Sequence, residues 1–174
     1  MSNIPKKHCL TFIGMSGVGK TTFGKKVAKE WNFTFIDTDS IIEKTIQQSI
    51  SDYINQKKEN SFLKKEEDII CNTIFEAPCI ISTGGSVIYS EKIMKHLKQC
   101  SSIIYLNDSL DNISKRVKQF SNRGVVMNKA KTIEEVYKQR HKLYSEYADI
   151  TITLPKQFHI KYTFEYIMSK LPNL

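Results

Sequence analysis

The chain has 174 residues, of which 40% are hydrophobic and 25% charged, and its formal net charge is +8. This length suits one folded domain, and no apolar run approaches the roughly 20 residues that a membrane-spanning helix needs. We therefore expect a single domain over residues 1–174 and no membrane partner.

The positive charge has two interpretations, a nucleic-acid surface or a lysine-rich solvated surface with a positive site for an anionic ligand. The lysines lie along helical stretches such as KKVAKEW, and aromatic residues do not alternate with them. The second interpretation is favoured, so we expect no nucleic-acid partner. The start, MSNIPKK, lacks the apolar segment of a signal peptide, which favours a cytoplasmic protein.

Strand and helix patterns alternate along the whole chain. Runs rich in β-branched and aromatic residues predict five strands, and apolar residues between them recur at helical spacing. This alternation predicts an α/β protein, a three-layer αβα fold around a five-stranded parallel sheet. In chain order we expect strand 8–13, helix 20–31, strand 33–37, helix 39–56 with a break near Ser49–Ser51, helix 61–76, strand 78–83, helix 90–99, strand 102–107, helix 109–120, helix 132–148, strand 150–154 and helix 159–171.

One long stretch, roughly 119–131, has no regular pattern and is a candidate mobile lid. The helix after it has a clear start, because Thr132 is followed three residues later by Glu135, which is a capping box.

The stretch GMSGVGKTT at 14–22 meets the pattern G-x-x-x-x-G-K-[ST] with Gly14, Gly19, Lys20 and Thr21. In such a P-loop, successive backbone N–H groups surround the β-phosphate of a nucleotide, and the next helix presents its positive N-terminus. Lys20 would reach the β- and γ-phosphates, and the Thr21 hydroxyl would bind Mg²⁺. A chance match is disfavoured because a predicted strand precedes the stretch and a helix follows it. We therefore expect a purine triphosphate, with Mg²⁺, as the ligand.

Polar groups also follow the next two predicted strands: Asp37 and Asp39 after the second, Gly84 and Gly85 after the third. The carboxyl ends of parallel strands face the ligand crevice, where an Asp can hold metal-bound water or accept a hydrogen bond from a substrate hydroxyl. Two alternatives stay open. Asp39 could simply be the N-cap of the next helix, and the glycines could form a tight turn.

Two arginines are further candidates. Arg123 lies in the irregular stretch and Arg140 on the capped helix. An arginine fork binds a carboxylate or phosphate through two hydrogen bonds, and one in a lid can neutralise charge on a transferred phosphoryl group. Taken singly, each is more often a surface charge.

Together these motifs resemble the shikimate kinases, within the nucleoside-monophosphate-kinase-like P-loop fold. The resemblance implies an ATP- and Mg²⁺-dependent monomer that transfers the γ-phosphate to the 3-hydroxyl of shikimate, a hydroxylated carboxylic acid, in aromatic amino acid biosynthesis. It runs almost end to end, through GMSGVGKTT, FIDTDSIIE, SISDYI, Phe62-x-x-x-Glu66, STGGSVI, IIYLN, Arg123 and Arg140-x-x-x-Tyr144-x-x-x-Ala148-Asp149.

The resemblance also implies the roles of individual residues. It makes Lys20, Asp39 and Arg123 catalytic; it gives nucleotide binding to Gly14, Gly17, Val18, Gly19, Lys20, Thr21, Thr22, Arg116 and Arg123, acceptor binding to Asp39, Gly84, Gly85 and Arg140, and Mg²⁺ to Thr21 and Asp37.

Three positions depart from the family pattern. Leu63 stands where the family has an arginine that binds the acceptor's carboxylate, and the lost charged hydrogen bonds are worth about 1.5–3 kcal/mol. Ser86 replaces the third glycine of the acceptor-binding run, and Arg123–Val126 reads Arg-Gly-Val-Val in place of Arg-Pro-Leu-Leu. Compensation by Lys64 or Lys65 is left open.

Three functions are therefore compared. The first is a shikimate kinase. The second is the same chemistry on another small hydroxylated acceptor, which Leu63 favours. The third is a non-catalytic nucleotide-binding regulator, which the intact Lys20, Thr21, Asp39 and Arg123 disfavour.

Overall fold

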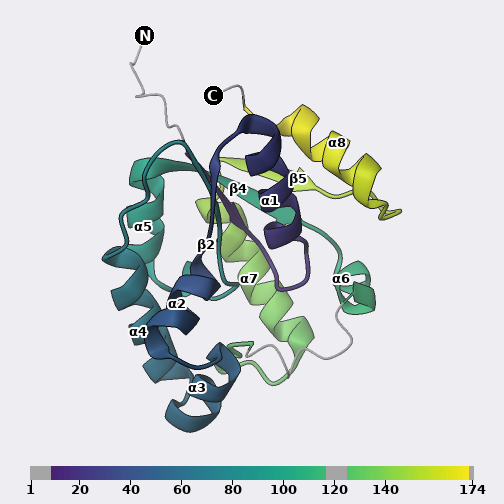
Figure 1. Ribbon diagram of the computed structural model, residues 1–174. Helices are drawn as coiled ribbons and strands as arrows, with labels where there is room; N and C mark the ends of the chain where they lie inside the picture. The colour runs from purple at the N-terminus through teal and green to yellow at the C-terminus, as the bar shows by residue number, and fades with distance from the viewer. Residues whose placement is uncertain (1–8, 117–124, 173–174) are drawn as a thin grey trace.

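The computed structural model describes residues 9–116 and 125–172 (Figure 1). They contain one sheet of five strands, and every pair of neighbouring strands runs parallel. Each strand begins and ends within one residue of its predicted bounds; His8 lies outside the described residues. The strands are β1 (Cys9–Ile13), β2 (Thr34–Asp37), β3 (Cys79–Ser82), β4 (Ser101–Asn107) and β5 (Ile150–Thr153), in the spatial order β2-β3-β1-β4-β5.

The helices follow the predicted order, and the long helix expected over 39–56 divides in two, as its pattern indicated. Residues 117–120, at the end of the helix expected over 109–120, lie outside the described residues. The helices are α1 (Lys20–Trp31), α2 (Thr38–Ile46), α3 (Ile50–Lys57), α4 (Glu59–Cys71), α5 (Glu91–Cys100), α6 (Leu110–Arg116), α7 (Ile133–Tyr147) and α8 (Ile160–Lys170), with a 3₁₀ turn, η1, at Val87–Tyr89.

Helix α4 ends five residues before the predicted Glu76, for a local reason. The side chains of Asn72 and Thr73 turn back and donate to the carbonyls of Asp68 and Ile69, each at 2.8 Å. Such side-chain bonds compete with the next turn of helix.

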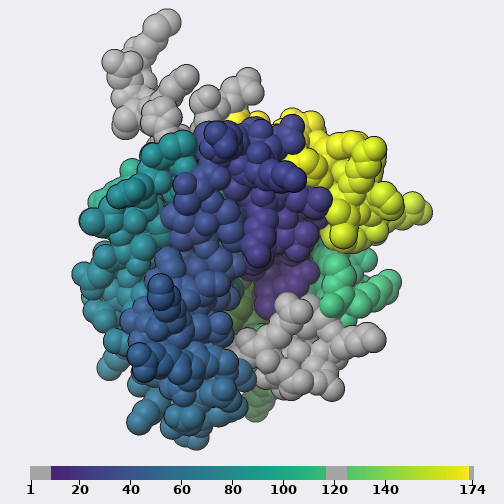
Figure 2. Space-filling model, viewed as in Figure 1, coloured from purple at the N-terminus to yellow at the C-terminus, as the bar shows by residue number. Residues whose placement is uncertain are grey.

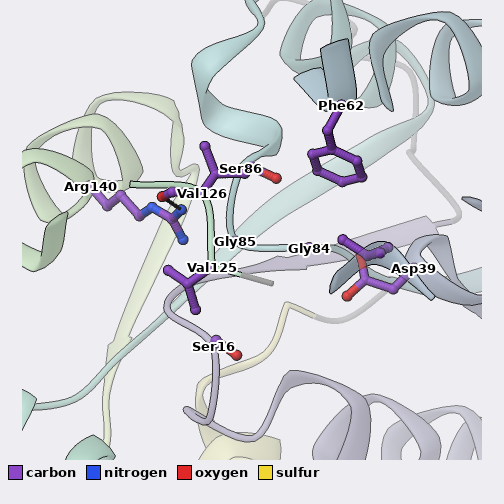
Figure 3. A pocket seen from close by; sticks show the side chains of 10 residues that line it. Ser16, Asp39, Phe62, Gly84, Gly85, Ser86, Val125, Val126 and Arg140 are labelled. Atoms are coloured by element: carbon purple, nitrogen blue, oxygen red, sulfur yellow. Dashed lines mark hydrogen bonds between the residues drawn. The ribbon is translucent and has the colours of Figure 1, made fainter. Parts of the chain in front are cut away.

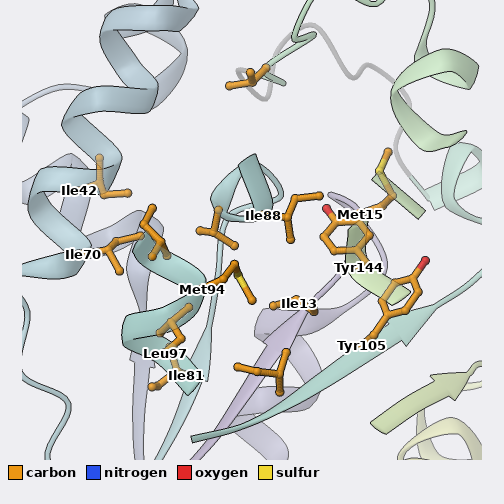
Figure 4. Close-up of a cluster of buried hydrophobic side chains, with 14 of the residues drawn as sticks. Ile13, Met15, Ile42, Ile70, Ile81, Ile88, Met94, Leu97, Tyr105 and Tyr144 are labelled. Carbon is orange, nitrogen blue, oxygen red and sulfur yellow. The ribbon is translucent and has the colours of Figure 1, made fainter. Parts of the chain in front are cut away.

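Helices cover both faces of the sheet, so the predicted three-layer αβα fold is confirmed (Figure 1). On the face seen in Figure 2, α8 (yellow) lies beside α1 (purple to dark blue). Along β1, alternate side chains point to opposite faces: Leu10 and Phe12 pack with α1 and α8, whereas Cys9 and Ile13 pack with α4, α5 and α7. The cluster that contains Cys9 and Ile13 is the larger of the two, and Figure 4 shows part of it.

The Thr132 cap expected at α7 is present, since the N–H of Glu135 donates to Thr132 Oγ1 at 3.2 Å. The Glu135 carboxylate reaches back to the N–H of Lys131 at 2.8 Å, one residue before the Thr132 N–H that a capping box uses, so the box itself is only half formed. At the other end of this helix, Asp149 accepts from the N–H of Ile103 at 2.8 Å, which ties the turn to β4. Within residues 9–116 and 125–172, no helix is long and apolar enough to cross a bilayer.

Candidate active site

The carboxyl ends of β1 and β3 form the crevice in which the polar candidates meet. These strands are neighbours, but the chain leaves β1 for α1 on one face and leaves β3 for α5 on the other. Connections that diverge in this way open a crevice at the carboxyl edge of a parallel sheet. Six residues of the P-loop stretch line it, together with Asp39 and the Gly84–Gly85 pair.

The P-loop lines a cleft of about 280 Å³. Its bend needs glycine at two points. Gly14 has φ 143° and a Cβ there would lie 2.6 Å from the carbonyl oxygen of Leu106; Gly19 has φ 110° and a Cβ would lie 2.7 Å from the ring of Phe23. The cleft is lined by Ser16, Gly17, Gly19, Lys20, Thr21, Thr22, Asp39, Thr83, Gly84, Gly85 and Arg116.

Two residues assigned to nucleotide binding by resemblance, Gly14 and Val18, do not line this cleft in the described structure. The carbonyl of Gly14 accepts from Lys20 Nζ, and the side chain of Val18 is fully buried in the core beside α1. Their positions fit a role in shaping the loop rather than in touching the ligand.

Lys20 is the first residue of α1, and its side chain folds back across the loop. Its ammonium group donates to the carbonyls of Gly14 at 2.8 Å and Met15 at 2.9 Å, and only 7% of the residue is exposed. These bonds hold a positive charge at the rim of the phosphate cleft before any ligand arrives.

Asp37, and not Asp39, is the N-cap of α2. One oxygen of Asp37 accepts from the N–H groups of Asp39 at 3.1 Å and Ser40 at 3.4 Å, and the other accepts from the hydroxyl of Thr21 at 2.9 Å. The capping alternative for Asp39 is therefore wrong, because Asp39 already lies in the first helical turn. Its carboxylate is left to face the cleft.

The Thr21–Asp37 pair fits a magnesium site. Mg²⁺ usually takes one or two protein oxygens, and substrate phosphates and water complete its octahedron. The described residues contain no group of three or more His, Cys, Asp and Glu side chains that could hold a metal by themselves. Thr21 and Asp37 meet beside the phosphate cleft, so they have the chemistry that such a shared site requires.

A second, smaller pocket of about 50 Å³ opens beside the phosphate cleft. Figure 3 shows Asp39 and Arg140 on its opposite sides, with Gly84 and Gly85 between them. Because Asp39 and both glycines also line the phosphate cleft, a molecule in this pocket would lie directly beside the nucleotide's phosphates. The pocket is lined by Ser16, Asp39, Ile50, Phe62, Gly84, Gly85, Ser86, Val125, Val126 and Arg140.

Arg140 is 2% exposed, which is unusual for a guanidinium group. It donates from Nη2 to the carbonyl of Val126 at 2.7 Å and from Nε to the hydroxyl of Tyr89 at 3.2 Å, and it lies over the Tyr89 ring. Sequence reasoning missed Tyr89, which lies 51 positions away in η1, because no local pattern reports such a contact.

Glycine is needed at positions 84 and 85 because a side chain would not fit there, not because of an unusual backbone angle. A Cβ on Gly84 would lie 2.6 Å from Asp39 Oδ1, and one on Gly85 would lie 2.4 Å from Arg140 Nη1. Side chains here would push both charged groups out of place. The carbonyl of Gly85 also accepts from the hydroxyl of Tyr144 at 2.8 Å, which holds the pair against α7. This pair is thus more than a tight turn.

The pKa of Asp39 is raised to about 6, mainly by burial and then by the nearby Asp37 carboxylate, whereas Lys20 acts in the opposite direction. Asp39 is therefore a carboxylate at neutral pH that becomes protonated in mildly acidic solution. This is the range in which a group that accepts a proton from a hydroxyl works well.

Glu66 is a second carboxyl at this wall, and sequence reasoning did not assign it a role. It is 1% exposed, and burial raises its pKa to about 8, against an opposing effect of the hydrogen bond from Ser86. The hydroxyl of Ser86 donates to Glu66 Oε1 at 2.8 Å. The serine that departs from the family's glycine run thus has a partner in the fold.

We expect Glu66→Gln to make the protein less sensitive to alkaline pH. The folded-state pKa of Glu66 lies above its usual value of 4.5, so its contribution to stability is complete below about pH 4.5 and is lost as pH rises through about 8. A glutamine keeps an acceptor for Ser86 and never ionises. In wild type, a decrease of about 2 kcal/mol in the free energy of unfolding would lower Tm by about 4–8 °C in a chain of this size.

The measurement is Tm from pH 5 to pH 9 for both proteins. The Tm of the variant should rise relative to that of wild type as pH increases, since other titrating groups affect both proteins equally. A Tm difference that is the same at pH 5 and pH 9 would show that Glu66 does not ionise there.

Arg116 lies at the far rim of the phosphate cleft. It pairs with Asp108, donates to the carbonyl of Gly17 at 3.3 Å, and its guanidinium lies 4.5 Å from the centre of the Phe158 ring. Arg123 lies outside the described residues, as does the first part of the predicted lid at 119–131.

The departure at Leu63 is not compensated by its neighbours. Leu63 packs partly buried against the larger core cluster. Lys64 is exposed, and Lys65 pairs with Asp68 at 3.6 Å. In the described structure, neither lysine lines the smaller pocket between Asp39 and Arg140, which we call the acceptor-side pocket. Arg140 is the one arginine among the described residues that line this pocket.

A family model and individual related proteins both indicate the family that the sequence motifs resemble. The family model described as "SKI: Shikimate kinase" matches residues 16–171. The chain belongs to the shikimate kinase family.

Individual relatives agree with this assignment. The chain is 32% identical over 165 residues to a shikimate kinase of Dictyoglomus turgidum, covering 92% of this chain and 96% of that protein. It is 37% identical over 145 residues to a shikimate kinase of Thermodesulfovibrio yellowstonii, covering 82% and 83%. Among solved structures, the fold is similar to shikimate kinase from Acinetobacter baumannii in complex with shikimate, with a TM-score of 0.78 and 22% identity, covering 92% of this chain and 90% of that one.

Membership in the shikimate kinase family makes the chain an ATP- and Mg²⁺-dependent kinase that phosphorylates an alcohol. The predictions of an enzyme, of its cofactors and of a P-loop kinase fold are confirmed. The alternative of a non-catalytic regulator is set aside.

Proposed function

We propose that this chain phosphorylates shikimate at its 3-hydroxyl with ATP as the donor. The observation that carries the proposal is the position of Asp39 and Arg140 on opposite sides of Gly84–Gly85, in a pocket that shares its wall with the phosphate cleft. A hydroxylated carboxylic acid offers a partner to each group. The match to curated shikimate kinases over most of the chain, and to a solved relative that binds shikimate, supports the choice of acceptor.

The proposed mechanism depends on position and charge. Arg140 binds the acceptor's carboxylate, and its bonds to Val126 and Tyr89 fix the guanidinium in advance. Asp39 accepts the hydrogen bond of the attacking hydroxyl and takes its proton as that oxygen bonds to the γ-phosphorus, while the bond from the γ-phosphorus to the β–γ bridging oxygen breaks and ADP leaves. Lys20 neutralises charge that develops on the transferred phosphoryl group, and the P-loop N–H groups bind the remaining phosphates.

Thr21 and Asp37 would hold Mg²⁺, which when bound neutralises the charge of the nucleotide's phosphates. Gly17, Gly19 and Thr22 line the same cleft and would approach the phosphates, whereas Arg116 at its far rim would lie toward the base. Two further assignments stay predictions: Arg123 as the lid arginine, and a monomeric, single-domain enzyme.

A different hydroxylated acceptor is the second candidate, and Leu63 favours it. With Arg140 alone, the described part of the pocket offers one guanidinium for the acceptor's carboxylate where the family pattern has two. This difference leads us to expect weaker binding of the acceptor's carboxylate rather than a change of reaction.

The experiment is a panel of hydroxylated acids and sugars assayed for ATP-dependent phosphorylation by coupled ADP release. We expect shikimate to give the highest kcat/KM, with Mg²⁺ required. A higher kcat/KM for another acceptor would replace shikimate in the proposal, and no turnover of any acceptor would contradict it.

A further inference from the structure

Glu59, the first residue of α4, contacts a distant part of the chain in a way that the proposed mechanism does not use. Its two carboxylate oxygens accept from two successive backbone N–H groups, those of Met127 at 2.8 Å and Asn128 at 3.0 Å. These partners lie 68 and 69 positions away in sequence. A carboxylate that accepts from two backbone donors makes charge-assisted bonds, which are stronger than neutral ones.

The segment that Glu59 holds leads directly into the acceptor-side pocket. Val125 and Val126, immediately before Met127, line that pocket (Figure 3). Val126 is 1% exposed. The carbonyl of Val126 accepts from Arg140 Nη2 at 2.7 Å. The backbone from Val126 to Asn128 is therefore fixed on one side by Arg140 and on the other by Glu59.

The backbone on both sides of this contact is in an unusual conformation. Lys58 has φ 71°, and Asn128 and Lys129 have φ 45° and 69°. Non-glycine residues with such angles persist only where the surroundings determine them strongly. Glu59 joins these two bends, so its loss should release the segment next to the pocket.

We propose that Glu59 is a positioning residue for the acceptor. Its carboxylate holds Met127 and Asn128, and through them it sets the place of Val126 and of the Arg140 guanidinium bonded to it. The proposal rests on the proposed function, since it takes the pocket at Arg140 as the acceptor site. It predicts that Glu59 affects acceptor binding without touching the acceptor.

The test compares Glu59→Ala, Glu59→Gln and wild type in steady-state kinetics, with shikimate or with the acceptor that the panel identifies. Loss of two charge-assisted bonds should raise the acceptor KM about tenfold in Glu59→Ala, while the ATP KM stays within about twofold. Glu59→Gln should lie between, because an amide keeps one acceptor oxygen but turns its NH₂ toward the other N–H donor.

Asp68→Ala is a control from the same helix. Asp68 also bonds to two groups, since it accepts from Nδ2 of Asn72 at 3.3 Å and pairs with the ammonium of Lys65 at 3.6 Å, but within the described residues neither partner lines the pocket or adjoins a residue that bonds to Arg140. Its loss should leave the acceptor KM unchanged. If Glu59→Ala behaves in the same way, or raises both KM values equally, the proposal is wrong.

Hydrogen exchange separates this proposal from the assignment of the acceptor. In the full chain without any acceptor, the amides of Met127 and Asn128 should exchange faster in Glu59→Ala than in wild type. Unchanged exchange would overturn the positioning role even if shikimate is the substrate. Faster exchange would support it even if the panel selects another acceptor.

Discussion

Lys20→Ala is expected to lower kcat by at least about 10²–10³-fold, because it removes a preorganised positive charge from the transferred phosphoryl group. The ammonium of Lys20 is held at the rim of the phosphate cleft by the carbonyls of Gly14 and Met15. The measurement is initial rate at saturating ATP and acceptor, since the effect should persist when both sites are full.

The matched control is Lys29→Ala, which removes an exposed lysine from the last turn of the same helix. It should leave kcat within about twofold of wild type. Because Lys20 also bonds to the loop, Tm is measured for both variants. A folded Lys20→Ala protein with wild-type kcat would contradict the assignment of the phosphate site.

Asp39→Asn is expected to lower kcat by about 10²–10⁴-fold, the usual contribution of a general base, with little change in nucleotide affinity. The amide keeps the size of the side chain but cannot take the hydroxyl's proton. The measurement is kcat at saturating substrates together with ATP binding by calorimetry. Equal losses in kcat and ATP affinity would instead make Asp39 a nucleotide ligand.

The pH profile gives a second view of the same group. Because the pKa of Asp39 is raised to about 6, kcat/KM for the acceptor in wild type should fall as pH drops below that value. The residual activity of Asp39→Asn should lack this limb. Asp111→Asn is the control: Asp111 holds the same first-turn position in α6 but is exposed, so its loss should change neither kcat nor the profile.

The parts of the site that the sequence predicts are those encoded by local pattern. The P-loop motif, the strand before it and the helix after it are contiguous, and that strand is itself a run of buried, largely apolar residues. The ends of strands in a parallel sheet must also lie at one edge, which brings Asp39 and Gly84 together from separate motifs. Local motifs and the topology of a parallel sheet are therefore enough to predict much of the crevice.

What the sequence does not predict are contacts between side chains from distant segments. The Glu66–Ser86 bond joins α4 to the residue before η1, and the Glu59 contacts join residues that are 68 and 69 positions apart. Which of the two aspartates caps α2 was also missed, since a shift of two residues in the helix start reverses their roles. These choices follow from packing, which single-sequence patterns do not record.

The most direct test of the central claim is a crystal structure with a non-hydrolysable ATP analogue, Mg²⁺ and shikimate bound together. The account predicts that the phosphates lie on the P-loop amides and that the acceptor's carboxylate meets Arg140. It also predicts that a hydroxyl in contact with Asp39 approaches the γ-phosphorus to about 3–3.5 Å. Phosphates bound elsewhere, or an acceptor that contacts neither Asp39 nor Arg140, would contradict it.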